Sequence, residues 1–189
     1  MGNLLSTAVN KFYNWASRLT PEKISFLGVF LIAVALRLIA WSNTPVIAPD
    51  GVLYISQAQA IFYGQWAEIA RCSGLDRLSD YPFLIAAFYN VFSDWIIAGK
   101  VINFIFGVAT IIPLYFLLRQ FFDYKISALT TLIIAVNPFF VSTSVEILRE
   151  PIYWFFSVLG FYFFTGGMDK NRRNFVFCSI VFLFNLQEP

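Results

Sequence analysis

Two acidic residues, Asp50 and Glu150, each lie where a helix is predicted to begin. Asp50 is part of the turn signal Pro49-Asp50-Gly51 ahead of a helical pattern, and Glu150 directly precedes Pro151, a residue type favoured at the first helical position. A helix N-terminus favours negative charge, so both side chains are expected to be carboxylates. Two carboxylates at one site could act as a general base and as the group that orients a nucleophile. For Asp50, helix capping is an alternative role that would also explain its position.

Three cationic residues could meet an anion carried by a lipid. Arg149 is adjacent to Glu150, Lys100 lies near one end of an apolar stretch, and Arg37 lies inside the first apolar stretch. An arginine fork holds phosphate well, so Arg149 or Lys100 could bind a lipid phosphate. Each has an alternative: Lys100 could extend to the headgroups, and Arg149 could form a local salt bridge. Arg37 could likewise extend to the headgroups or join an inward-facing charge pair.

The composition of the chain is that of an integral membrane protein. Of 189 residues, 59% are hydrophobic and 13% charged, against roughly 25% charged in a typical soluble domain. A net charge of +2 is too small to imply nucleic acid or another polyanion as a partner. The two cysteines, Cys72 and Cys178, have no metal or redox spacing, and the chain contains no histidine. No metal ligand set is predicted, although a divalent cation is left open.

Apolar stretches of about 20 residues predict an all-α fold, a polytopic bundle of transmembrane helices. The stretches cover residues 25–41, 95–118, 126–145 and 151–168, and a further one begins at residue 175 and reaches residue 189. That last stretch is short of a full crossing, so we expect an N-terminal fragment of a longer protein. Residues 1–24 are predicted to be a cytoplasmic N-terminus, and residues 25–189 one transmembrane domain with an outer loop at 42–94. Asn137-Pro138 should loosen or kink the third stretch.

The distribution of Lys and Arg predicts the orientation of the chain. Residues 81–92 are apolar but too short to span a membrane. If they do not cross, most of the Lys and Arg residues lie on the same side as the N-terminus. If they do cross, most of them lie on the opposite side. Positive charge is enriched on the cytoplasmic side, and the first arrangement separates the charges more strongly, so it is preferred. The predicted cytoplasmic cations are Lys11, Arg18, Lys23, Arg119, Lys125, Lys170, Arg172 and Arg173, and the opposite ones are Arg71, Arg77, Lys100 and Arg149. The outer loop and residues 142–150 then share the non-cytoplasmic face, and compact loops favour a bacterial plasma membrane.

The outer loop is predicted to contain an amphipathic helix that lies on the membrane surface. Its apolar stripe consists of Tyr54, Ile55, Ala58, Ile61 and Phe62. Three polar residues fall away from that stripe, Ser56, Gln57 and Gln59. Gly64 ends the pattern where a helix C-cap is expected. Ordinary loop packing is the alternative to a surface helix.

Several short motifs occur in order between residues 26 and 164. They are Ala35-Leu36-Arg37-Leu38, Pro49-Asp50-Gly51-Val52-Leu53-Tyr54, Tyr81-Pro82, Ala98-Gly99-Lys100-Val101-Ile102-Asn103, Ile112-Pro113-Leu114-Tyr115 and Asn137-Pro138-Phe139 with Leu148-Arg149-Glu150-Pro151. Their order and spacing resemble the GT-C glycosyltransferases, in particular the branch of protein O-mannosyltransferases and lipid A aminoarabinose transferases. Many members have a second acid after the first, where this chain has Gly51.

The resemblance implies a membrane enzyme. It would take a sugar from a polyprenyl-phosphate carrier and transfer it, with inversion, to an acceptor that is a protein, a lipid or a glycan. The resemblance assigns a catalytic role to Asp50 and a second acidic role to Glu150. It implies substrate-binding roles for Arg37, Tyr54, Tyr81, Lys100 and Arg149. The expected partners are the lipid-linked donor, membrane lipids and an unidentified acceptor. A transporter or flippase and a non-catalytic membrane scaffold remain the alternatives.

Overall fold

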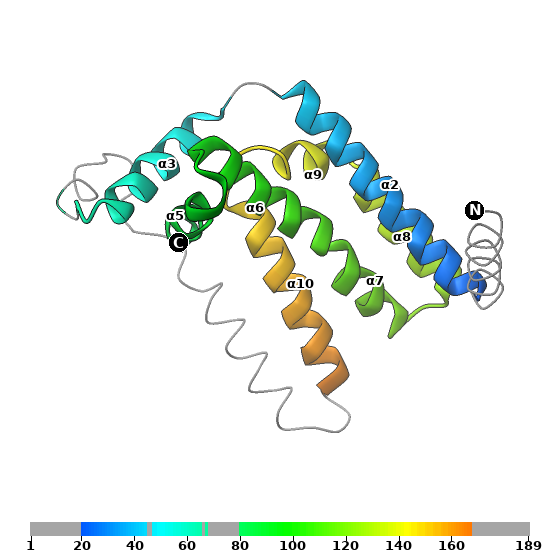
Figure 1. The fold of residues 1–189 in the computed structure, drawn as a ribbon. Helices are drawn as coiled ribbons and strands as arrows, with labels where there is room; N and C mark the ends of the chain where they lie inside the picture. The colour runs from blue at the N-terminus through cyan, green and yellow to red at the C-terminus, as the bar shows by residue number, and fades with distance from the viewer. Residues whose placement is uncertain (1–19, 45–46, 66, 68–79, 168–189) are drawn as a thin grey trace, which may run out of the picture.

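The computed structural model describes residues 20–44, 47–65, 67 and 80–167, which form helices joined by short connections (Figure 1). No strand occurs among these residues, so the predicted all-α class is confirmed for them. The apolar stretch predicted from residue 175 lies outside the described residues, as does most of the predicted cytoplasmic N-terminus.

Two helical stretches are long and apolar enough to cross a membrane, by length and composition alone. The first is α2, Pro21–Asn43, and the second, Trp95–Arg119, comprises α6, Trp95–Ala109, and α7, Ile111–Arg119. Asp94 caps α6 by accepting hydrogen bonds from the N–H groups of Ile96 and Ile97. The break between α6 and α7 follows from Pro113, which has no N–H to donate to the carbonyl one turn earlier.

The third predicted span, residues 126–145, is not one continuous helix but is broken at Asn137-Pro138, where the sequence predicted a loosening or kink. It comprises α8, Tyr124–Val136, and α9, Pro138–Thr143. Asn137 separates them because a residue before proline is driven out of the α region. Its side chain then accepts a hydrogen bond from the N–H of Phe139 at 3.0 Å. Neither α8 nor α10, Glu150–Gly167, meets the same length and composition criterion within the described residues, so their crossing stays a prediction.

Two polar contacts fix which helix ends lie together. Arg119 Nε lies 2.8 Å from Glu22 Oε1, which joins the end of α7 to the start of α2. Lys100 Nζ donates to the Thr44 carbonyl at 2.6 Å, which joins the start of α6 to the end of α2. α2 therefore runs antiparallel to α6 and α7, and α8 packs along it (Figure 1).

The two helices described between α2 and α6, in the predicted outer loop, pack on each other and on the start of α6. They are α3, Pro49–Phe62, and α5, Tyr81–Phe92. Their shared core consists of Tyr54, Ala58, Tyr81, Ile85, Ala86, Ala98, Ile102 and Ile147. The prediction that Gln57 falls away from the apolar stripe is wrong, because its side chain is fully buried. Gly64 follows α3 with φ +70°, a conformation that glycine adopts without strain.

Candidate functional site

The segment that precedes α10 lies directly against the first turn of α3. Ile147 is fully buried, and a Cβ added at Gly51 would lie only 2.9 Å from its carbonyl oxygen. A Cβ added at Gly99 would lie 2.9 Å from Ile147 Cγ2. Both positions are too crowded for a side chain, so the two glycines let α3 and α6 approach Ile147. We call this contact of Gly51, Gly99 and Ile147 the Ile147 junction. Asp50 and Glu150 are both within three residues of it in sequence.

Asn103 holds the segment on either side of Ile147. Its side chain is fully buried, and Nδ2 donates to the carbonyl oxygens of Glu146 and Leu148. Oδ1 is also buried and has no hydrogen-bond partner among the described residues. Asn103 belongs to the motif Ala98-Gly99-Lys100-Val101-Ile102-Asn103, but the sequence alone predicted no role for it. An amide inside the apolar stretch 95–118 is the signal that could have found it, because a buried polar group requires partners.

Asp50 lies exposed in the first turn of α3. The capping alternative is wrong, because the helix begins at Pro49 and the N-cap residue is Ala48, with no side-chain cap hydrogen bond. Within the described part of the chain, no hydrogen bond or ion pair engages the Asp50 carboxylate. An exposed carboxylate without such a partner can accept a proton or a hydrogen bond from a bound ligand.

Glu150 begins α10 and is only partly buried, but its Oε2 atom is buried without a hydrogen-bond partner among the described residues. An unsatisfied buried acceptor costs free energy, so this oxygen is suited to accept a hydrogen bond from a ligand. Its position at a helix N-terminus also favours negative charge.

Tyr81 lies among the other polar side chains of this region. Burial raises the pKa of Tyr81 well above its ordinary value, and the neighbouring Tyr54 raises it further. The Asn103 side chain lowers this pKa, and the charge of Glu150 raises it. The hydroxyl therefore stays neutral and donates to the Gly99 carbonyl at 3.2 Å. The rings of Tyr54 and Tyr81 meet edge to face with centroids 5.2 Å apart.

Two of the predicted cations lie at the same end of the bundle. Lys100 is 7% exposed and bonded to Thr44, so the alternative in which it extends to the headgroups is wrong. An ammonium has three N–H donors, and this bond uses one of them. The Arg149 guanidinium lies 6.0 Å from the centroid of the Tyr153 ring, within the range of a cation–π interaction.

Arg37 is placed apart from the other predicted site residues. It is 2% exposed, so the prediction that it extends to the headgroups is wrong. Nη1 donates to the carbonyls of Ala33 at 3.1 Å and Ala135 at 3.4 Å, and no acid pairs with Arg37 in the described part of the chain. The inward-facing charge pair is therefore absent there. The cavity that Arg37 lines includes none of the other predicted site residues.

The crowding at Gly51 bears on metal binding. The described residues contain no group of three or more His, Cys, Asp and Glu side chains that could hold a metal ion. Position 51, where many members of the GT-C family have a second acid, packs against the Ile147 backbone and has no room for a carboxylate. A carboxylate at position 51 therefore cannot serve as a metal ligand in this structure.

The chain matches a known protein family. A family described as dolichyl-phosphate-mannose-protein mannosyltransferase matches residues 81–185, more than half of the 189-residue chain. The match includes Tyr81, Lys100, Arg149 and Glu150, and it begins after Asp50. The resemblance inferred from the motifs is thereby confirmed. No curated protein and no solved structure matches the chain.

Proposed function

We propose a function from one premise, which is that the chain belongs to the dolichyl-phosphate-mannose-protein mannosyltransferase family. It is a membrane glycosyltransferase of the GT-C type. In our proposal it takes a sugar from a polyprenyl-phosphate carrier and transfers it, with inversion, to an acceptor hydroxyl on the non-cytoplasmic face of a bacterial plasma membrane. The observation that carries the proposal is the Ile147 junction, which supports a common site for Asp50 and Glu150.

Asp50 is the proposed general base. The acceptor hydroxyl oxygen attacks the anomeric carbon while its proton passes to the Asp50 carboxylate. The bond from the anomeric carbon to the phosphate oxygen breaks, and the polyprenyl phosphate leaves with the bonding electrons. Attack on the face opposite the leaving group inverts the anomeric centre. The exposure of Asp50 supports this role, because a base must be within reach of the proton that it accepts.

Glu150 is the proposed orienting group. Its buried Oε2 atom lacks a partner among the described residues, so a hydroxyl of the donor sugar or of the acceptor could donate to it. The charge of Glu150 acts on the neutral Tyr81 hydroxyl, and the Tyr81 ring packs against the Tyr54 ring, which supports a rigid aromatic pair near the same site. Holding the reacting groups in one geometry lowers the barrier by removing their freedom before the reaction.

Arg149 and Lys100 are proposed to stabilise the leaving phosphate. Preorganised cations lower the free energy of a transition state in which negative charge develops. Contact with the Tyr153 ring restricts the Arg149 guanidinium, and the hydrogen bond to Thr44 restricts the Lys100 ammonium. Their placement at the end of the bundle that carries the Ile147 junction supports a role for both in the same site.

The proposal is tested by a transfer assay on the full-length protein in sealed vesicles. A polyprenyl-phosphate-linked mannose is the first donor to supply, because the family is described by that sugar. Covalent transfer that depends on Asp50 supports the enzyme. Movement of the intact donor across the vesicle membrane without covalent transfer would support the transporter alternative instead.

A further inference from the structure

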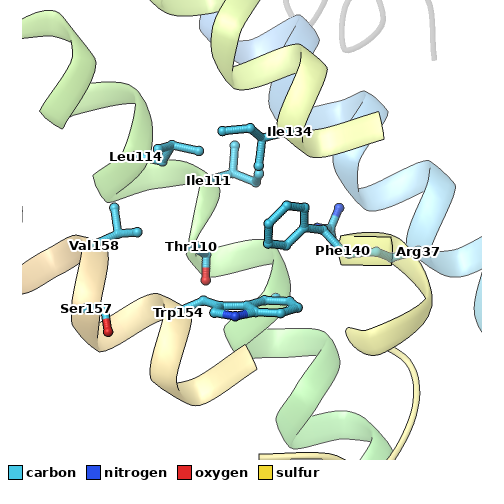
Figure 2. Close-up of a pocket in the computed structure, with 10 residues that line it drawn as sticks. Arg37, Thr110, Ile111, Leu114, Ile134, Phe140, Trp154, Ser157 and Val158 are labelled. Carbon is cyan, nitrogen blue, oxygen red and sulfur yellow. The ribbon is translucent and has the colours of Figure 1, made fainter. Parts of the chain in front are cut away.

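A cavity of about 260 Å³ lies between α2, the α6–α7 break, α8, α9 and α10 (Figure 2). Most of its lining is apolar, from Ile111, Leu114, Ile134, Phe140, Trp154 and Val158. In Figure 2 the α10 side chains Trp154 and Val158 lie on the side of the cavity opposite those of Ile111, Leu114 and Ile134. At roughly 30 Å³ for each water-sized volume, the cavity has room for a small headgroup and a few carbon atoms.

Arg37 is the charged residue of this cavity, and its charge is not balanced by an acid in the described part of the chain. Its two hydrogen bonds run from Nη1 to backbone carbonyls, and Nε is buried without an acceptor. A guanidinium stays charged in proteins, so Arg37 cannot become neutral to avoid this cost. A charge buried in an apolar bundle is costly unless it is paired. The partner that this environment lacks is an anion.

The apolar lining restricts what that anion can be. A small inorganic anion would bring its hydration shell against apolar side chains such as Ile111, Leu114 and Phe140, which offer it no hydrogen bonds. An oxyanion on an alkyl chain satisfies both parts of the cavity, because its head can pair with Arg37 while its first carbons lie against the rings. A guanidinium fork matches phosphate and carboxylate groups equally in geometry.

We infer that this cavity binds the oxyanion head of a membrane amphiphile, a phosphate or a carboxylate on an alkyl chain. The inference goes beyond the proposed function, since neither Asp50 nor Glu150 lines the cavity. The amphiphile balances the charge of Arg37 and fills the space between α2 and α10. It is not consumed by the transfer reaction.

The test measures binding of three probes to the full-length protein in a non-ionic detergent by native mass spectrometry. Dodecyl phosphate, dodecanoate and dodecanol share one chain and differ in the head. We expect at least one of the two anions to bind 10-fold or more tightly than dodecanol, and the comparison between them identifies the preferred head. In an Arg149→Gln background, which removes a cation of the proposed donor site, Arg37→Gln should reduce anion binding to the level of dodecanol. Arg119→Gln, the same change at an arginine outside the cavity, should leave it unchanged.

A second variant distinguishes loss of the binding site from misfolding of Arg37→Gln. Val158→Trp keeps Arg37 and fills the cavity, so in the same Arg149→Gln background it should also abolish binding of the anionic probe. Equal binding of dodecanol and both anions would overturn the inference, as would anion binding that survives both changes in the Arg149→Gln background. Loss of dodecyl phosphate binding in Arg149→Gln, but not in Arg37→Gln, would assign the anion to the proposed donor site and would equally overturn it.

Discussion

Gly51 and Ile147 are packed so closely that a Cβ at position 51 would lie 2.9 Å from the Ile147 carbonyl oxygen. This contact joins the first turn of α3, which carries Asp50, to the segment that leads into Glu150. It also explains why the chain has glycine where many members of the GT-C family have a second acid. The two proposed catalytic segments meet through backbone, and there is no room for a further carboxylate between them.

Replacing Gly51 by alanine should therefore weaken the fold at the Ile147 junction. Overpacking of a close contact costs about 1–3 kcal/mol, so Gly51→Ala should lower the thermal denaturation midpoint and the transfer rate together. Gly28→Ala is the matched control, because nothing lies within 4 Å of a Cβ at that position. Alanine in a helix interior is favoured over glycine, so the control should match or exceed the wild-type midpoint. A Gly51→Ala protein as stable and active as the control would show that the contact is unimportant.

Asn103 should be essential to the position of Glu150. In Asn103→Asp the side chain keeps its shape but can no longer donate to the carbonyls of Glu146 and Leu148. Each buried acceptor left unsatisfied costs about 1–3 kcal/mol, so the denaturation midpoint should fall. Turnover measured well below that midpoint should fall as well, because Glu150 is displaced.

Asn90→Asp provides the control for Asn103. Asn90 Nδ2 also donates to two backbone carbonyls, Ala86 and Ala87, each at 3.3 Å, but it does so at an exposed position. Water can replace those bonds, so the cost should stay within about 0.5 kcal/mol. Equal effects of the two substitutions on turnover would refute a positioning role for Asn103.

Arg149 should contribute to donor binding. Loss of a charge-assisted phosphate contact is worth about 1.5–3 kcal/mol, so Arg149→Gln should raise the donor KM roughly 10- to 150-fold. Arg119→Gln removes an arginine at the opposite end of the bundle, where it pairs with Glu22, and the donor KM should not change. A wild-type KM in Arg149→Gln would exclude the phosphate contact. Arg149 is a better probe than Lys100, because loss of the bond from Lys100 to Thr44 would also disturb the fold.

Helices that local sequence determines were predictable. The stretch 81–92 is bounded by Tyr81-Pro82 at its start and by polar residues at its end, and α5 occupies it. Glu150-Pro151 marked the start of α10, since proline is favoured in a first turn. In each case the signal lies within a few residues of the helix end, so no knowledge of the rest of the chain is needed.

Features that depend on tertiary contacts were not predictable from the pattern. Gln57 is polar and lies off the apolar stripe, yet its side chain is buried in the structure, where α3 packs mainly on α5. Arg37 and Lys100 resemble side chains that reach the membrane surface, but their carbonyl partners are up to 98 residues away in sequence. The role of Asn103 depends on a segment more than 40 residues later. Hydrophobic periodicity carries no information about such partners.

The predicted sidedness can be tested with single cysteines after Cys72 and Cys178 have been replaced. Ser42 and Ser142 are exposed near the end of the bundle that carries the Ile147 junction, and Lys125 is exposed at the other end. Cysteines at positions 42 and 142 should react with an impermeant thiol reagent in intact cells. A cysteine at 125 should react only after permeabilisation. Labelling of positions 42 and 142 from opposite sides would contradict the shared outer face of the two acids.

The central claim is that Asp50 removes the proton of the acceptor. The most direct measurement is the single-turnover transfer rate of Asp50→Asn, because asparagine keeps the shape of the side chain but cannot accept that proton. Asp94→Asn is the matched control: Asp94 also lies at a helix start, where it caps α6, and asparagine caps about as well as aspartate.

Asp50→Asn should fold, bind donor with wild-type affinity and transfer sugar roughly 100-fold more slowly or worse, which is the usual contribution of a general base. Asp94→Asn should transfer at close to the wild-type rate. An Asp50→Asn enzyme that retains most of its single-turnover rate would contradict the assignment of Asp50 as the base.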